Sequence, residues 1–197
     1  MIGQSGNFNN DLTVPPMRSM RYDSPAQLYA AVPEVAAFTK HRPSVEEDNF
    51  YYFQRLKGST TPEDAITFAA FSAEARSAIH WAMQAVRTTL PEPGPEDAEL
   101  LIAIGQWMDY PGNETRWRAL QLALFAPRRS PIVYIGLAVG WSGGIMAPND
   151  PSRPPVWRTA SAVNAALLTT LARGGAEQRS VNMARILDAA TSLFRGR

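Results

Sequence analysis

The sequence predicts an all-α protein, and three observations support this fold class. Apolar residues recur with the 3.6-residue period of an amphipathic helix, most clearly over residues 72–90. Pairs such as Ser24–Pro25 and Ser130–Pro131 match the residues that begin helices. No segment of strand length alternates cleanly between apolar and polar residues. Short connectors between such helices indicate a single-domain antiparallel bundle of about eight helices.

The N-terminal half contains the first group of expected helices. Pro33 suits the first position of a short helix, because the missing N–H of proline has no partner there. Ser44 and Glu47 form a capping-box pattern. Ser72 is the expected N-cap of the clearest amphipathic helix. The expected helices are therefore 25–31, a short one from Pro33, 44–56, 61–71 and 72–90.

The second group of helices follows the rigid connector 91–95, PEPGP. The apolar run 132–141 contains β-branched residues that would suit a buried strand, but its length and the preceding Ser130 favour a buried helix. Gly174–Gly175 separates the last two helices. The expected helices of this half are 98–110, 113–127, 130–141, 156–172 and 176–194.

Residues 1–23 are expected to form an N-terminal arm outside the all-α domain 24–197. They are polar and contain several asparagines and the pair Pro15–Pro16. Two alternatives remain open for this arm. Either a partner chain holds it, or it folds back over its own domain.

Composition excludes several classes of function. A net charge of +1 gives no field that favours nucleic acid or an acidic membrane surface. The chain has no cysteine, and its two histidines, His41 and His80, lie far apart, so neither a metal site nor thiolate chemistry is expected. No phosphate-binding glycine loop is present, and no cofactor is expected. The longest apolar run is about half of what crosses a bilayer. With no targeting segment visible, we expect a soluble, cytoplasmic protein.

The segment 140–157, GWSGGIMAPNDPSRPPVW, stands out because it cannot be regular structure. Its glycines permit positive φ and its prolines forbid helix. Long loops between core elements are often functional. We expect a structural framework formed by Trp141, Ser142, Gly143, Gly144, Pro148, Pro154, Pro155 and Trp157. We expect Trp141 to be mostly buried and the tip 146–153 to face a partner protein through Met146, Asn149, Asp150 and Arg153.

The sequence Gly140–Gly144 also fits G-x-S-x-G, the nucleophile elbow of serine hydrolases, with Ser142 as the nucleophile. The elbow needs a strand before the serine and a helix after it, and the prolines that follow Gly144 cannot begin a helix. In that fold the histidine follows the serine, and no histidine follows Ser142. A tight turn at a helix C-terminus explains these residues better.

Several stretches resemble one known family of small bacterial proteins, a domain of unknown function with a WSGG…AP…PP segment. The stretches are 76–82, 136–148, Pro154–Pro155 and 160–168, and between them Trp107, the turn 109–111 and Arg116 fall in matching order. Members of this family are often encoded beside type VI secretion genes. The family has no established activity, so the resemblance implies no catalytic residue. Where this chain has His80, the family tends to have a second aromatic residue. The arm 1–23 lies outside the resemblance.

We therefore expect a non-enzymatic accessory protein, an adaptor or chaperone of type VI secretion, that binds another protein. The resemblance implies a secretion effector, an adaptor or a spike component as the partner. Two alternatives stay open: a serine hydrolase that uses Ser142, and a structural or immunity-type binding protein of a phage or toxin system. A homo-oligomer also stays open, while nucleic acid and membrane are not expected partners.

Overall fold

The computed structural model describes residues 19–90 and 93–195, and within these ranges the protein is all-α, as predicted. Within these ranges there are ten α-helices and one short 3-10 helix, and two of the ten are only seven and four residues long. Each α-helix overlaps one of the ten segments expected to be helical, so the stated total of about eight was low. The elements in chain order are α1 (Pro25–Ala31), α2 (Val35–Phe38), α3 (Asn49–Lys57), α4 (Glu63–Ser72), α5 (Ala75–Thr89), η1 (Pro95–Asp97), α6 (Ala98–Asp109), α7 (Asn113–Leu124), α8 (Pro131–Trp141), α9 (Val156–Arg173) and α10 (Arg179–Arg195).

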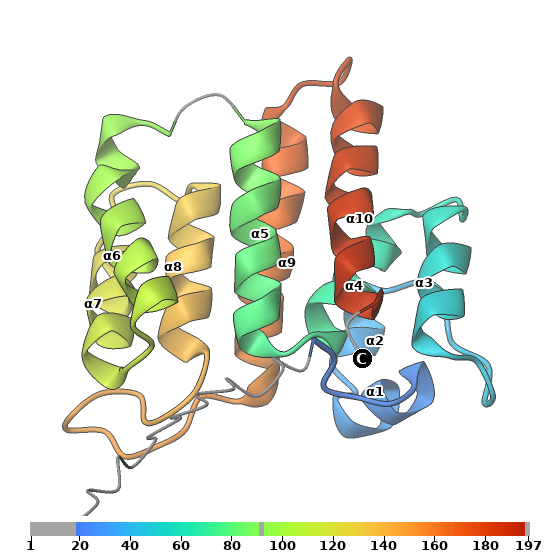
Figure 1. Ribbon diagram of the computed structural model, residues 1–197, viewed down its shortest axis with the longest axis horizontal. Helices are drawn as coiled ribbons and strands as arrows, with labels where there is room; N and C mark the ends of the chain where they lie inside the picture. Colours follow the sequence, from blue (N-terminus) through green and yellow to red (C-terminus); the bar gives the residue numbers. More distant parts are fainter. Residues whose placement is uncertain (1–18, 91–92, 196–197) are drawn as a thin grey trace, which may run out of the picture.

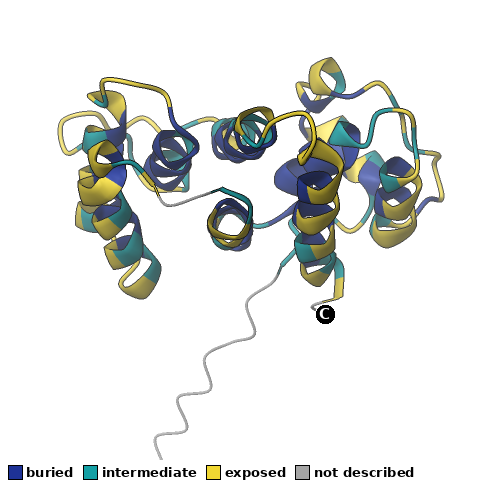
Figure 2. Ribbon diagram, turned by 90° about the horizontal axis from the view of Figure 1, so that it is seen from above, coloured by how far each residue is buried: buried dark blue, intermediate teal, exposed yellow. Residues whose placement is uncertain are grey.

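The helices form two groups that meet at a central pair (Figure 1). Helices α6, α7 and α8 pack together at one end, and α1 to α4 gather at the other end with α10. Helices α5 and α9 stand between the groups, and α9 packs against α4, α5, α8 and α10. Figure 2 shows the buried residues on the inner faces of these helices and the exposed residues on the outer faces.

Helix α8 lies at the centre of its group because it is apolar on all sides. Nine of its eleven residues are buried, and Ser130 caps it by accepting a hydrogen bond from the Val133 amide at 3.1 Å. This confirms the prediction of a buried helix rather than a buried strand. Gly140 lets α7 approach closely, since a Cβ atom at Gly140 would collide with Leu120.

The start of α3 differs from the expected one. The amide of Ser44 donates to Glu47 Oε2 at 3.0 Å, so half of the capping box forms, but only as an isolated turn. The same carboxylate also pairs with Arg55, whose Nε lies 2.7 Å from Glu47 Oε1. The helix begins at Asn49, because Asp48 is its N-cap and accepts from the Tyr51 amide at 2.8 Å. Asp48 therefore takes the capping role that the pattern assigned to Ser44.

Ser72 ends α4 and does not cap α5, so this prediction was wrong. The N-cap residue of α5 is Glu74. Ala73 and Glu74 have extended backbones and lie beside the end of the predicted arm: the Arg21 amide donates to Ser72 O at 2.8 Å, and the Glu74 amide donates to Ser19 O at 2.9 Å. Residues 19–21 are thus fixed to the α4–α5 junction. Residues 1–18 of the arm lie outside the described residues.

Smaller shifts affect the other boundaries. Helix α2 begins at Val35 and not at Pro33, and α7 ends at Leu124. Asn113 is the first residue of α7, whose N-cap is Gly112, because the Asn113 side chain accepts from Arg116 instead. The last helix begins at Arg179. No helix within the described ranges has both the length and the apolar character that a membrane crossing requires.

Candidate functional site

The loop between α8 and α9, residues 142–155, is held at its base by one buried arginine. Arg116 on α7 is only 3% exposed. Its Nη1 donates to Gly140 O at 2.6 Å, and its Nη2 donates to Ile145 O at 2.5 Å and to Asn113 Oδ1 at 3.2 Å. Trp117 Nε1 also donates to Ile145 O, at 3.2 Å. One guanidinium therefore joins the end of α8 to the start of the loop.

Arg116 has no carboxylate within 4.0 Å among the described residues. Burial lowers the pKa of Arg116 from its usual value, because the charged form loses its hydration. Two features compensate for this cost. The carbonyl of Gly140 belongs to the last turn of α8, where the helix dipole is negative, and the guanidinium carbon lies 5.6 Å from the centre of the Trp117 ring. Backbone carbonyls thus take the place of an acidic partner.

Gly144 is the residue that the base of the loop most requires. It has φ +67°, in the left-handed region that favours glycine. A Cβ atom at this position would lie 2.8 Å from Asn113 Oδ1 and 3.0 Å from Arg116 Nη2. Gly143 has φ 158°, at the edge of that region, and open space around it. Both glycines have positive φ as predicted, and Gly144 is the more constrained of the two.

The tip of the loop is organised by its own hydrogen bonds. The Met146 amide donates to Ser152 O at 2.8 Å, and Ala147 and Asp150 exchange two backbone bonds of 3.3 and 3.0 Å across Pro148. Asp150 Oδ1 also accepts from the Ser152 amide at 3.0 Å. Hydrogen bonds from the side chain and backbone of Ser152 lower the pKa of Asp150. The loop therefore carries a defined turn at its far end.

Exposure separates the four predicted partner residues. Asn149, Asp150 and Arg153 are exposed at the tip, whereas Met146 is half-buried. Asn149 and Asp150 lie together in the turn at Pro148, while Arg153 lies in the segment that leads from this turn to α9. Three of the four predicted partner residues are therefore exposed at the tip, and Met146 is partly covered.

Seven of the eight predicted framework residues lie at the two ends of the loop, whereas Pro148 is exposed in the turn at the tip. Trp141 and Trp157 are half-buried and pack against the core. Trp141 also has the guanidinium carbon of Arg158 at 5.5 Å from its ring centre. Pro155 is the N-cap residue of α9, with φ −54° and ψ 140°, and Pro154 is half-buried before it. Proline at both positions restricts the backbone conformation of the segment that leads into α9.

Ser142 is the residue that follows α8, and its hydroxyl donates to Val139 O at 2.7 Å. No other hydrogen bond to its side chain is present within the described ranges. The residue before it belongs to a helix and not to a strand. The arrangement matches the tight turn at a helix end that the sequence favoured.

Two polar sites were not found from the sequence. Asp64 is 4% exposed, and its Oδ2 accepts from the amides of Lys40 and His41 at 2.8 and 3.0 Å and lies 2.9 Å from His41 Nδ1. Asp64 therefore fixes the connector that precedes α3. No pattern in the sequence indicates that residues 40 and 64 meet.

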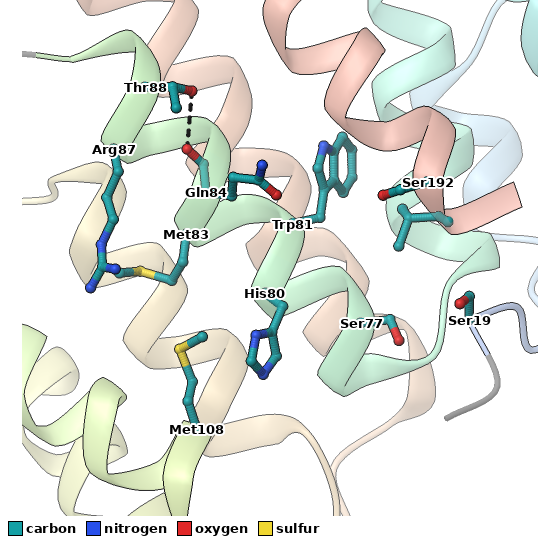
Figure 3. A pocket seen from close by; sticks show the side chains of 11 residues that line it. Ser19, Ser77, His80, Trp81, Met83, Gln84, Arg87, Thr88, Met108 and Ser192 are labelled. Carbon is teal, nitrogen blue, oxygen red and sulfur yellow. Dashed lines mark hydrogen bonds between the residues drawn. The ribbon is translucent and has the colours of Figure 1, made fainter. Parts of the chain in front are cut away.

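The second unexpected site is a shallow hollow of about 530 Å³ on the outward face of α5. Ser77, His80, Gln84 and Arg87 line it from α5, and Met108 lines it from α6 (Figure 3). These α5 residues share one helix face opposite the core face, which the helical period of 72–90 already implied. The sequence did not indicate which residues of other helices would lie beside this face of α5. No cluster of three or more metal-binding side chains occurs in the part of the chain that the structure describes.

The comparisons with known proteins bear on the family alone. Among the curated proteins and the solved structures, nothing matches this chain. One family model matches residues 52–194, which contain every helix from α4 to α9, most of α3, most of α10, the loop after α8 and the hollow on α5. The matched family is described only as a family of unknown function. On this match, which covers well over half of the sequence, the chain belongs to the family of unknown function DUF6931.

Proposed function

We propose that this chain is a non-enzymatic, protein-binding accessory protein that presents the tip of the α8–α9 loop to its partner. The observation that carries the proposal is the combination of an exposed tip with a fixed base. The tip exposes Asn149, Asp150 and Arg153, while the base is tied by the buried guanidinium of Arg116. A loop that is ordered before binding loses little conformational entropy when it binds.

The chemistry of the tip favours a polar protein surface as the target. It offers one carboxylate, one carboxamide and one guanidinium. Asp150 accepts a hydrogen bond from the Ser152 amide, and its hydrogen bonds with Ser152 lower its pKa below the ordinary value. Loops on a rigid scaffold are common carriers of recognition residues. Two prolines, Pro148 and Pro151, flank the exposed pair and limit the conformations that it can take.

The resemblance stated from the sequence extends the proposal to type VI secretion. In that setting the protein would act as an adaptor or chaperone, and the partner would be a secretion effector, another adaptor or a spike component. The secretion part rests on this resemblance and not on the shape of the loop. It requires that genes beside this one encode secretion components. If they encode phage or toxin-system proteins instead, the alternative of a structural or immunity-type protein takes its place.

Co-purification with the products of the neighbouring genes tests the proposal. We expect one product to bind, and we expect Asn149→Ala and Arg153→Ala to weaken binding about tenfold each, the effect of losing a good polar anchor. Both variants should melt within about 1 °C of the wild-type protein, because neither side chain is buried. Arg128→Ala is the matched control, since Arg128 is exposed on a different loop.

Two results would contradict the proposal. One is that no neighbouring product binds the wild-type protein. The other is that the two tip variants bind as tightly as the Arg128→Ala control. The hydrolase alternative has a separate test, which is labelling of Ser142 by a fluorophosphonate probe. We expect none, because the Ser142 hydroxyl already donates to Val139 O and no general base is hydrogen-bonded to it among the described residues.

A further inference from the structure

The outward face of α5 forms a shallow trough between α6 and α10, named here the α5 trough. No other described helix covers this face, as the views from the front and from above show (Figures 1 and 2). The lining side chains come from α5, α6, α10 and the segment that leads to α1, and the hollow measures about 530 Å³. The trough is separate from the α8–α9 loop, none of whose residues line it.

Apolar and polar side chains alternate around the trough. Figure 3 shows Met83, Met108 and Arg87 on the side toward α6. Trp81, Ser77 and Ser192 lie on the side toward α10. His80 lies between them. Methionine side chains are flexible and polarisable, and they are common on surfaces that receive partner helices. The residues that line the trough thus resemble a recognition surface more than an ordinary solvated helix face.

Two polar atoms in the trough have no hydrogen-bond partner within the described part of the chain. They are Ser77 Oγ and His80 Nε2, and both atoms are shielded from solvent. Ser77 is 6% exposed as a residue. Leaving a buried polar atom unpaired is unfavourable, but both atoms are shielded from solvent, so they lie behind the surface of the trough and are not contact points on it. Burial and the nearby Arg76 lower the pKa of His80, against the opposite effect of Asp109, so its imidazole is neutral near pH 7.

The charge of the trough is positive. Arg87 lines it, and no Asp or Glu is among its lining residues. Arg87 makes no ion pair within 4.0 Å among the described residues. Arg76 lies beside the C-terminal end of α6, where its Nη2 donates to Met108 O at 3.0 Å. The acidic groups nearby are Asp109, whose charge acts on His80, and Glu74, which faces Arg21 at 4.0 Å.

We propose that the α5 trough is a docking site for an acidic amphipathic helix of a partner protein. Ser77, His80, Gln84 and Arg87 follow the helical period and span about 15 Å, which is close to three turns of a helix laid along α5. In such a complex an apolar residue packs against Met83 and Met108, and a carboxylate binds Arg87. This surface is additional to the loop tip and does not depend on it.

Site-specific photo-crosslinking tests the occupant directly. The variant Gln84→p-benzoylphenylalanine places the crosslinker on an exposed position of the trough, and Arg185→p-benzoylphenylalanine on the exposed side of α10 is its matched control. Both full-length proteins are irradiated in the cell that produces the neighbouring gene products, and the crosslinked peptides are sequenced by mass spectrometry. We expect the Gln84 position, and not the Arg185 position, to join one acidic helical segment of another protein.

A charge change then separates recognition from mere proximity. Adding Arg87→Glu to the Gln84 crosslinking variant should lower the yield about tenfold, because it places like charges opposite each other. A synthetic peptide of the captured segment should bind wild-type protein about tenfold more tightly than Arg87→Glu in fluorescence polarisation. Asn149→Ala should leave this binding unchanged, so failure of the loop-tip proposal is distinguishable from failure of this one.

Four results would overturn the α5-trough proposal. The Gln84 position can crosslink to residues 1–18 of its own chain, which makes the trough an internal contact. It can crosslink to a second copy of the protein, which makes it an oligomer interface. It can capture a segment that carries no carboxylate and ignores Arg87→Glu. The last result is the absence of any crosslink above the Arg185 control.

Discussion

Replacing Arg116 with lysine tests whether a single guanidinium holds the α8–α9 loop. The wild-type side chain bonds Gly140 O at 2.6 Å and Ile145 O at 2.5 Å from two different nitrogens. Lysine keeps the positive charge but has one nitrogen at the end of a flexible chain, so it cannot reproduce the planar fork. At least one of the two carbonyls therefore loses its charged donor, and the Asn113 bond is lost with it.

The magnitude follows from the number of bonds lost. A hydrogen bond to a charged group contributes about 1.5–3 kcal/mol. Ile145 O keeps Trp117 Nε1 as a donor, and the loop side of the site is partly open to water, so the loss at that carbonyl is reduced. We expect Arg116→Lys to lower the free energy of unfolding by about 2–3 kcal/mol. For a chain of this size that corresponds to a fall in Tm of about 4–12 °C.

Arg118→Lys on the same helix is the control. Arg118 pairs with Glu99, and the two side chains are 50% and 66% exposed. Exposed pairs contribute about 0–1 kcal/mol, so this variant should melt close to the wild-type protein. Urea denaturation and thermal melting by circular dichroism measure both. Equal stability of the two variants would refute the role assigned to Arg116.

Three further predictions concern stability. Gly144→Ala should lower the free energy of unfolding by about 2–3 kcal/mol in a urea titration, because it adds a collision with Asn113 to the cost of a positive φ. Its control is Gly175→Ala, at φ +76° in open space, which should show only the backbone cost of about 1–2 kcal/mol in the same titration. Ser142→Ala should cost less than about 1–2 kcal/mol, since only the bond to Val139 O is lost, and a larger loss in calorimetry would show a role beyond the turn. Hydrogen bonds from Arg55 and the Ser44 amide lower the pKa of Glu47, against the effect of burial; this stabilisation is present above the ordinary pKa of 4.5 and is lost as the pH falls below it. Glu47→Gln should therefore be less stable than wild type at pH 7, with a difference that narrows below pH 4.5, and a difference independent of pH would contradict the ion pair.

The sequence predicted the helices well where local signals and burial agree. Ser130 and Pro131 open α8, and the apolar run that follows has only one way to avoid water, which is a central position. Helix α9 begins at Val156 as predicted, because a proline pair is unsuited to a helix interior and Pro155 takes the N-cap position. Signals of this kind lie within one short stretch of sequence, so these helix boundaries can be predicted without knowing the tertiary contacts.

The boundaries that failed depend on contacts that the local pattern does not contain. Ser72 has the chemistry of an N-cap, but it remains in α4, and residues 19–21 pair with the backbone at 72–74. Glu47 accepts from the Ser44 amide as a capping box requires, but Asp48 caps the helix in place of Ser44. In the first case a tertiary contact, and in the second a competing cap, outweighs a local preference of about 1 kcal/mol.

The candidate sites show the same division. The unusual composition of residues 140–157 marked the loop, and its exposed polar tip lies where the sequence placed it. The buried state of Arg116 could not be predicted, because it depends on α7 meeting the end of α8. The α5 trough could not be predicted either. The sequence shows the polar stripe of α5, but it does not show that α6 and α10 pack on either side of that stripe.

The roles of the base and the tip of the loop can be separated by measuring partner binding in Arg116→Lys. If the loop opens locally at a cost of about 2–3 kcal/mol in the wild-type protein, losing that amount makes the open and closed forms about equally populated. Binding through the closed form alone would then weaken only about twofold, because the apparent Kd rises by the inverse of the closed fraction. Loss of a tip contact such as Arg153 should weaken binding about tenfold without changing stability. Titration calorimetry with the co-purified partner distinguishes the two effects. An unchanged Kd in a destabilised Arg116→Lys protein would show that the partner does not need the loop in its closed form, and an unchanged Kd in Arg153→Ala would show that the partner does not bind the tip through Arg153.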